Sequence, residues 1–469
     1  MSEEDELKRE IGAFGAFSMG YADVGADIYI SLGLIALYAL QAAPIALLIA
    51  SITYITTGLS YAELASTYPV AGGAHYYAYK AFGKLNGFLA GWGLMLDYTV
   101  NIALFSLAAV GYLGFLVEAF WGSGIILMNP YYGISAIFLI LALIVLNIIG
   151  IKYSSRFNEL FVMIDLFTVG VLLLSGVATL LFSGRVILWF NSLSNIGETP
   201  SWNGFAYAIT LSMASYIGIE SISQAAEETK NPKRIIPMAT KAAIISVLIV
   251  ALMASLLSVT LLDVSTIGSR AQDPMVALAS SIPYIGGLLS LWIGFMGFMI
   301  CYVSTNTGVI GVSRVTFSMG RLKLSPQIFR RVHKRFRTPY VTIIIFPLIA
   351  IAIIMSNIFL SSLDLLELVA SLYNFGALIS YMYVNLALVI LHKESKEGWH
   401  TPWVIKIPYH GKKTELPLIP LIGFISCFTI WVMMVITHEQ GRLLGFAWFS
   451  FGVILYLVMR LKRRIGKDE

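Results

Sequence analysis

The chain has 469 residues, of which 58% are hydrophobic and only 12% charged. Soluble domains carry about 25% charged residues, so this composition, with a mean hydropathy of +0.81, excludes a soluble protein and predicts an integral membrane protein. The formal net charge of +5 gives no reason to expect a nucleic-acid partner, because the basic residues lie in loops that flank apolar segments.

Twelve apolar segments are long enough to cross a bilayer, which takes about 20 apolar residues. They predict an all-α integral membrane fold. We expect no cleavable signal peptide, because the first ten residues are charged and mixed in sign. Cys301 and Cys427 fall within predicted spans and are expected to be buried thiols without a disulfide. The predicted spans cover residues 11–35, 41–65, 86–118, 132–150, 156–182, 203–226, 236–262, 283–312, 339–357, 363–391, 417–438 and 442–460.

The distribution of basic residues predicts the orientation in the membrane. Only three of the 31 Lys and Arg residues, Arg185, Arg270 and Arg442, fall on the side opposite the N-terminus. Cytoplasmic loops carry an excess of Lys and Arg. We therefore expect a multi-pass protein of the cell membrane with both termini in the cytoplasm, as an even number of spans requires.

The first span carries two aspartates in its middle, Asp23 and Asp27, with Gly25 between them. On insertion scales an aspartate at the centre of a membrane helix costs roughly 2.5–3.5 kcal/mol, so both need a reason to be there. Glycine lets a helix unwind, and unwound backbone inside a membrane is tolerated only where it lines a protein cavity. We expect the first span to be broken at its centre, as in transporters that hold substrate and ions at discontinuous helices.

Three later spans also carry polar groups. The fifth contains Asp165, with no basic residue within a helical turn, and the sixth repeats the first by placing Gly218 and Glu220 near its middle. The eighth contains the hydroxyls of Ser304 and Thr305. Hydroxyl and carboxylate oxygens are ligands for a hard cation such as Na⁺, and a desolvated carboxylate can also serve a proton relay.

The likeness of the first and sixth spans predicts an internal repeat. If spans one to five and six to ten form two halves, the second half enters from the opposite side, because five is odd. The division expected is residues 1–182 for the first inverted repeat, 183–393 for the second, and 394–469 for the last two spans and a cytoplasmic tail.

Several motifs then resemble the amino acid–polyamine–organocation transporter superfamily, of the amino acid permease type. Each motif is short, but their order along the first ten spans is specific. They are LSYAEL at 59–64, YPVAGG at 68–73, AFG at 81–83, GW at 91–92, LDY at 96–98, IGIES at 217–221, AEETKNPKRIIP at 226–237, SRV at 313–315, MGR at 319–321 and FRTPY at 336–340.

The resemblance implies a five-plus-five inverted-repeat fold, the LeuT-like fold, with broken helices 1 and 6 and alternating access. In that family, free amides at the first break hold the substrate's carboxylate, which agrees with the attraction of helix N-termini for anions. The matching positions here are Gly25, Ala26, Asp27, Ile28 and Tyr29. Asp27 departs from the family pattern and would repel a substrate carboxylate, which favours an amine, a polyamine or an inorganic cation such as K⁺.

In the sixth span the resemblance implies that Ser215 and Ile217 line the substrate pocket and that Glu220 acts in gating. We add Tyr216 and Gly218 to the expected binding residues, because they lie at the break. We assign ion or proton coupling to four further residues, of which Asp165 could hold Na⁺ with the hydroxyls of the eighth span or carry a proton itself. Each of these residues could also be purely structural, as a helix cap, a hydrogen-bond anchor or a hydroxyl bonded to its own helix. The coupling set is Asp165, Ser304, Thr305 and Asp23.

Four other acids are expected to be structural and to pair with Lys or Arg near the cytoplasmic ends of spans. They are Glu63, Asp97, Glu227 and Glu228. No cofactor or metal site is expected beyond coupling to Na⁺ or H⁺, and no obligate protein partner is evident. The expected partners are a small-molecule substrate and membrane lipid.

The sequence thus predicts a secondary active transporter that moves a small amino acid or amine in symport with H⁺ or Na⁺. The same fold could instead carry K⁺ or a polyamine. Two interpretations of another class stay open, a passive cation channel and a transporter-like sensor. An enzyme is not expected, because the sequence contains no metal-ligand spacing, nucleophile elbow or phosphate loop.

Overall fold

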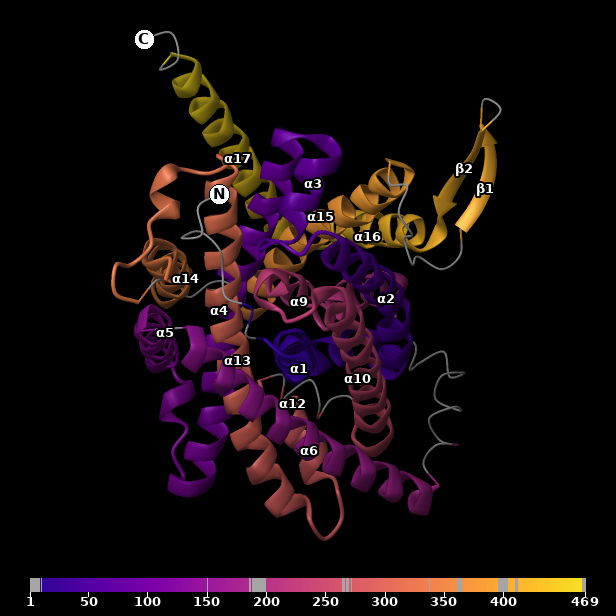
Figure 1. Ribbon diagram of the computed structural model, residues 1–469. Coiled ribbons are helices and arrows are strands. Elements are labelled where there is room, and N and C mark those ends of the chain that lie inside the picture. Colours follow the sequence, from indigo (N-terminus) through magenta and orange to yellow (C-terminus); the bar gives the residue numbers. More distant parts are fainter. Residues whose placement is uncertain are drawn as a thin grey trace.

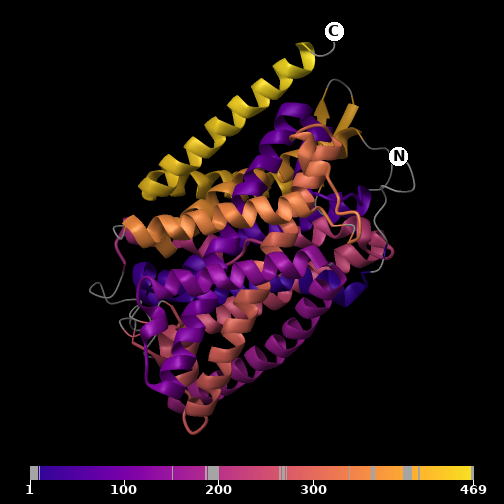
Figure 2. The ribbon, with the colours of Figure 1, turned by 90° about the vertical axis from the view of Figure 1, so that its left-hand side faces the viewer.

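The computed structural model is a bundle of helices with one small hairpin, shown in Figures 1 and 2. It describes residues 9–465 except 10, 150, 185–186, 188–199, 264–265, 267–269, 271, 337, 361–364, 395–403 and 410–411. Arg185 and Arg337, which entered the topology argument or a motif, lie outside the described residues.

The described helices follow the predicted spans closely, because each is a long apolar stretch that satisfies its own backbone hydrogen bonds. The first half contains α1 (Ala13–Ala39), α2 (Ala43–Thr67), α3 (Ala74–Phe82), α4 (Lys84–Trp121), α5 (Tyr131–Ile149) and α6 (Ile151–Ser183). After it come α8 (Trp202–Ala214), α9 (Glu220–Gln224), α10 (Pro232–Leu261), α12 (Pro274–Ser280), α13 (Gly286–Arg321), α14 (Tyr340–Leu360), α15 (Leu365–Glu394), α16 (Leu418–Thr437) and α17 (Glu439–Ile465).

Short elements connect these helices. Strands β1 (Val404–Tyr409) and β2 (Lys412–Pro417) pair antiparallel in register Val404 with Pro417. The 3-10 turns are η2 (Leu40–Ala42), η3 (Ile125–Leu127), η5 (Ala226–Glu228) and η6 (Gln327–Arg330).

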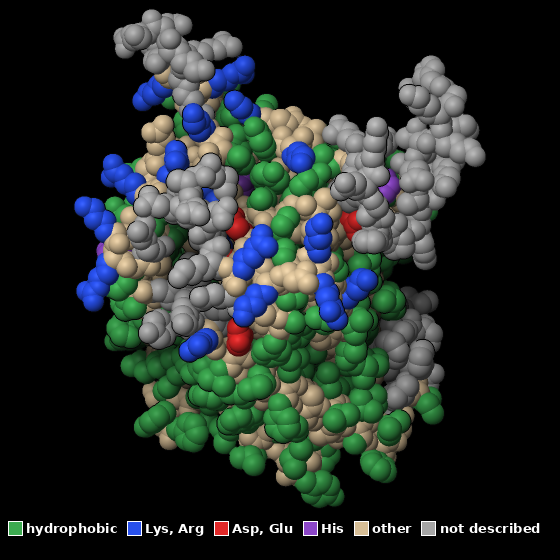
Figure 3. Space-filling view, in the orientation of Figure 1, with side chains coloured by type: hydrophobic (Ala, Val, Ile, Leu, Met, Phe, Trp, Pro, Cys, Tyr) green, Lys and Arg blue, Asp and Glu red, His purple; other side chains and the backbone are tan. Residues whose placement is uncertain are grey.

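Within the described residues, 9 helical stretches are long and apolar enough to cross a membrane. The first, Ala13–Thr67, contains both α1 and α2, and Tyr340–Ser356 of α14 is a shorter apolar stretch. An all-helical, multi-span membrane fold is therefore confirmed. In Figure 3, Lys and Arg side chains gather in the upper part of the visible face, near the N-terminus, while hydrophobic side chains cover its lower part.

The predicted break in the first span is wrong, because α1 runs through Gly25 without interruption. A β-carbon on Gly25 would stand 3.0 Å from a ring carbon of Tyr21, one turn earlier. The glycine therefore makes room for the tyrosine ring against the helix and leaves the backbone hydrogen bonds in place. The aspartates on either side project from an intact helix toward its neighbours.

The predicted break in the sixth span is present. Helix α8 ends at Ala214, α9 begins at Glu220, and Gly218 between them has a φ of +117°. Glycine adopts this conformation without the steric cost that other residues meet. Helix α1 packs against α8, α10, α13 and α6, so the interruption lies against a largely buried helix. By contrast, α17 lies along the outside of the bundle (Figure 2), and only 11% of its most apolar stretch is buried.

Candidate functional site

Asp23 is the centre of a polar network that joins four helices beside the interruption. Its Oδ1 accepts hydrogen bonds from Asn101 Nδ2 at 2.9 Å and Ser304 Oγ at 3.2 Å, and its Oδ2 accepts one from Ser221 Oγ at 2.8 Å. The side chain is fully buried. These three donors supply the partners that a buried carboxylate requires.

Glu220 opens the second half of the interrupted helix and is fixed to the interruption itself. Its Oε2 accepts from the hydroxyl of Tyr381 at 2.5 Å and from the backbone N–H of Gly218 at 3.1 Å. The same N–H also lies 3.2 Å from the Tyr381 hydroxyl. The carboxyl of Glu220 is therefore tied to the backbone at Gly218. Its predicted gating role requires a connection of this kind.

Asp27 differs from Asp23 in having a free oxygen. Its side chain is 2% exposed, and no described donor reaches Oδ2. Asp27 lines a cavity of about 10 Å³, room for one water molecule. The other lining residues, mostly apolar, are Ile30, Ser31, Leu34, Leu104, Leu211, Ala214 and Ala370.

The hydroxyls of Ser31 and Ser215 join α1 to the interruption next to this cavity. Their oxygens lie 2.5 Å apart, and the Ser31 hydroxyl also lies 2.8 Å from the carbonyl oxygen of Asp27. The ring of Tyr216 stacks on that of Tyr54 in α2, with centroids 5.1 Å apart. Of the predicted substrate-binding residues, Asp27 lines the cavity, Ser215 contacts its lining residue Ser31, and Tyr216 packs against α2.

The other predicted binding residues lie in the same region. Ala26, Ile28 and Tyr29 are buried in the continuous helix α1, so their amides serve that helix. Ile217 is also buried, in the interruption. The backbone of Gly218 packs on Asp23.

Asp165 is held by two tyrosines of α1 that stand two helical turns apart. The Tyr29 hydroxyl donates to Oδ1 at 2.6 Å and the Tyr21 hydroxyl to Oδ2 at 3.0 Å. The hydroxyl of Tyr112 in turn donates to the backbone carbonyl of Tyr29 at 2.6 Å. Both oxygens of the carboxyl are thus satisfied, and the fifth span is anchored to the first.

The hydroxyls of Ser304 and Thr305 in the eighth span form their hydrogen bonds with groups other than Asp165. Ser304 donates to Asp23, and the Thr305 hydroxyl bonds to the carbonyl of Cys301 on its own helix at 3.0 Å. The coupling role predicted for Asp165, Ser304 and Thr305 therefore stays a prediction.

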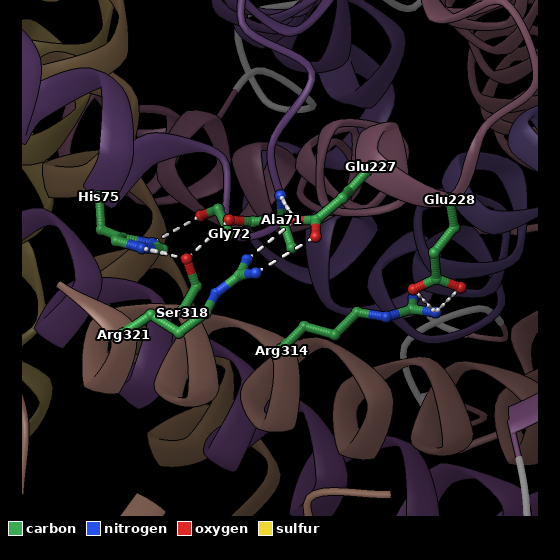
Figure 4. Close-up of polar contacts among 8 residues, drawn as sticks. All are labelled: Ala71, Gly72, His75, Glu227, Glu228, Arg314, Ser318 and Arg321. Atoms are coloured by element: carbon green, nitrogen blue, oxygen red, sulfur yellow. Dashed lines mark hydrogen bonds and ion pairs between the residues drawn. The ribbon is translucent and has the colours of Figure 1, made fainter. Parts of the chain in front are cut away.

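On the side of the bundle where the chain begins, two ion pairs join α13 to the segment after α9 (Figure 4). Arg321 pairs with Glu227 at 2.8 Å, and Arg314 pairs with Glu228 at 2.9 Å. Glu227 also accepts from the backbone N–H of Ala71 at 2.8 Å, which adds the loop before α3. The expected pairing of Glu227 and Glu228 with basic residues is confirmed.

His75 stands next to these ion pairs and is fully buried (Figure 4). Nδ1 lies 2.8 Å from the carbonyl oxygen of Gly72, which can only accept, so Nδ1 carries the proton. Nε2 lies 3.0 Å from the Ser318 hydroxyl. Burial, reinforced by the charge of Arg321, lowers the pKa of His75 to about 4, so the ring is neutral at neutral pH.

With this geometry established, comparison with known proteins identifies the family. The sequence model of the amino acid permease family matches residues 11–459. The chain belongs to the amino acid permease family.

Relatives in this family share about a quarter of their residues with the chain. The branched-chain amino acid permease BcaP of Bacillus subtilis (strain 168) is 27% identical, over 98% of this chain and 95% of the relative. The low-affinity putrescine importer PlaP of Escherichia coli (strain K12) is 27% identical, over 88% and 84%. The serine/threonine exchanger SteT of Bacillus subtilis (strain 168) is 26% identical, over 98% and 99%.

Membership of the amino acid permease family confirms three predictions. The resemblance to the amino acid–polyamine–organocation superfamily is correct, the protein is a membrane transporter, and it is not an enzyme. Its place is in a membrane that it crosses several times.

One residue of this permease site was placed wrongly from the sequence. Asp97 does not pair with a basic residue at a span end: it is fully buried in α4 and faces Glu220. Its sequence surroundings carried the same signal that singled out Asp165, since no Lys or Arg lies within a helical turn of it. It was nevertheless predicted to be structural, because it belongs to the LDY motif of the resemblance.

Proposed function

We propose that this protein is a secondary active transporter that carries a small substrate through its ammonium group, an aliphatic amine or an amino acid, by alternating access. The observation that carries this proposal is the unpartnered, buried Oδ2 of Asp27 at an apolar cavity. A buried carboxylate that lacks a counter-charge is costly. An ammonium group at this point would compensate it, and the apolar residues around the cavity, which here has room for one water molecule, would have to move apart to admit its alkyl chain.

The surrounding backbone favours a cation as well. Helix α8 ends at Ala214, at the cavity, and the carbonyl end of a helix carries partial negative charge. The amides of α1, which would hold a substrate carboxylate at a broken helix, are engaged in the continuous helix. Recognition through the substrate's ammonium group is therefore the stronger expectation, and a carboxylate is not required.

The membrane architecture proposed with this function has twelve spans arranged as two inverted repeats, with both termini in the cytoplasm. Transport would proceed by rocking α1, α2, α8–α9 and α10 against α4, α5, α13 and α14. The clustering of Lys and Arg near the N-terminus supports the orientation (Figure 3). The relatives include a branched-chain amino acid permease and a putrescine importer, which supports the substrate class.

Two other candidates are weaker on the same observation. K⁺ takes several oxygen ligands, whereas the cavity at Asp27 offers few polar groups beside Ser31. A passive channel needs a continuous polar path, and the described cavity is small and enclosed by Leu and Ile side chains. Coupling by H⁺ is favoured over Na⁺, because the hydroxyls expected around Asp165 bond elsewhere.

Thermal stabilisation of the purified protein tests the substrate class. A ligand bound only to the folded state, at 100 times its Kd, adds about 2.7 kcal/mol of stability. We expect stabilisation by putrescine, butylamine or aliphatic amino acids but not by K⁺ or butyrate, and loss of that effect in Asp27→Asn. Glu118→Gln, which removes an exposed carboxyl from α4, is the control and should respond like the wild type.

Three results would contradict this proposal. Stabilisation by K⁺ alone would replace the amine with an inorganic cation. Equal stabilisation of the wild type and Asp27→Asn by an amine would remove Asp27 from the binding site. Uptake into proteoliposomes that rises linearly with substrate concentration, without saturation, would identify a channel.

A further inference from the structure

Asp97 of α4 and Glu220 of α9 form a carboxyl pair that the binding site does not use. The two side chains lie within hydrogen-bonding reach of each other, and both are at most 1% exposed. No donor among the described residues reaches either oxygen of Asp97 or the Oε1 of Glu220.

A contact of this kind needs a proton. An ionised carboxylate has only acceptor oxygens, so two of them cannot form a hydrogen bond. Two negative charges side by side in a buried site also repel strongly, and such pairs share a proton. The ion pairs found among the described residues use Arg270, Arg314 and Arg321, which pair with other acids.

The described groups that face the pair come from several helices, and none of these is basic. The groups that interact electrostatically with Asp97 or Glu220 are Asp23 and Asp27 of α1, Tyr54 and Tyr61 of α2, Tyr98 of α4, and Tyr373 and Tyr381 of α15.

One of these groups is a buried hydroxyl that is not fixed by a described hydrogen bond. The Tyr61 hydroxyl is buried, with its residue 1% exposed, and it has no described hydrogen-bond partner. It faces both carboxyls from a different helix.

The pair is also connected to the interruption. Glu220 receives hydrogen bonds from Tyr381 and from the N–H of Gly218 through Oε2, which leaves Oε1 without a described donor. Repulsion between Asp97 and an ionised Glu220 would therefore act on the backbone at Gly218, the least regular point of the sixth span.

We propose that Asp97 and Glu220 together hold one exchangeable proton, and that the movement of this proton to and from water drives the transport cycle. With the proton bound, the carboxyls attract each other and keep α9 against α4. When the proton leaves, they repel, and Glu220 carries Gly218 with it. The coupling role rests on the proposed function, whereas the shared proton does not.

Infrared difference spectroscopy of the purified protein tests the shared proton directly. We expect the wild type to show the carbonyl band of a protonated carboxylic acid at neutral pH, and Asp97→Asn to lack the intensity of one such group. Glu118→Gln, an exposed acid on the same helix, should leave the band unchanged. An unchanged band in both Asp97→Asn and Glu220→Gln would overturn the proposal.

Proteoliposome transport tests the coupling. An imposed pH gradient should produce at least a tenfold loss of substrate accumulation in Asp97→Asn relative to the wild type, while counterflow exchange and thermal stabilisation by substrate remain. Asp97→Glu, which restores a carboxyl, should recover accumulation.

Accumulation by Asp97→Asn at the wild-type level, or accumulation driven by Na⁺ without a pH gradient, would overturn the coupling role. Absence of any substrate binding in the wild type would instead overturn the proposed function, and the infrared result would still decide the shared proton.

Discussion

Gly218 lies directly against Asp23, where the interrupted sixth span meets the continuous first span. A β-carbon on Gly218 would stand 2.6 Å from the β-carbon of Asp23, and the φ of Gly218 is +117°. Two separate requirements therefore exclude a side chain here, the backbone conformation and the space occupied by Asp23. This contact places the Asp23 network, the Glu220 carboxyl and the cavity at Asp27 around one point of the bundle.

Gly218→Ala should therefore destabilise the protein strongly. Backbone strain at this φ costs about 1–3 kcal/mol, and the overlap with Asp23 adds roughly 1–3 kcal/mol. Thermal unfolding in detergent measures the effect. Gly170→Ala is the control, because no atom lies within 4 Å of its added β-carbon and alanine favours a helix by about 1 kcal/mol. A Gly218→Ala protein as stable as the control would contradict the contact.

Asp165→Asn should weaken the anchor between α6 and α1 without abolishing coupling. Two buried tyrosine hydroxyls, those of Tyr21 and Tyr29, would lose their charged acceptor, at a cost of about 1–3 kcal/mol. A lower Tm with retained pH-driven accumulation is the expected result. Complete loss of accumulation at an unchanged Tm would instead return the coupling role to Asp165, as the sequence first suggested.

Arg321→Gln should loosen the contact between α13 and the segment after α9, on the side where the chain begins. The pair with Glu227 is partly buried, at 21% and 15% side-chain exposure, so its loss is expected to cost about 1–3 kcal/mol. A cysteine placed at Ser221 should then react faster with a water-soluble thiol reagent than in the parent Ser221→Cys protein. The exposed Lys84→Gln serves as the charge-matched control. Equal reaction rates in the two Ser221→Cys backgrounds would show that this ion pair does not restrict access.

His75 should make stability fall in mild acid. Because burial lowers its pKa to about 4 from an ordinary value of about 6.5, the unfolded chain binds a proton there that the folded chain does not. The stability contribution is complete above about pH 6.5 and decreases as the pH falls toward 4.

The Tm of the wild type at about pH 7.5 and about pH 5, compared with that of His75→Gln, measures this contribution. The variant should show a smaller acid loss, and the remainder includes His438, whose pKa burial also lowers to about 4. An identical acid loss in both proteins would mean that His75 is protonated when folded.

Much of the architecture could be read from the sequence because it depends on local, strong signals. Long apolar segments predicted the helices, and the described helices overlap the predicted spans. The glycine and acid near the middle of the sixth span predicted an interruption that is present. The same pattern in the first span predicted one that is absent, because Gly25 accommodates the Tyr21 ring.

The sequence by itself determined the class of protein, the course of the helices and which residues would be costly to bury in a membrane. Only the tertiary structure decided how each of those residues is satisfied. Asp23 and Asp165 obtain their donors from other helices, Asp27 keeps a free oxygen at a cavity, and Asp97 meets Glu220. The physical reason is that insertion into a membrane is a sum over single residues, whereas the partner of a buried carboxyl depends on side chains distant in the chain.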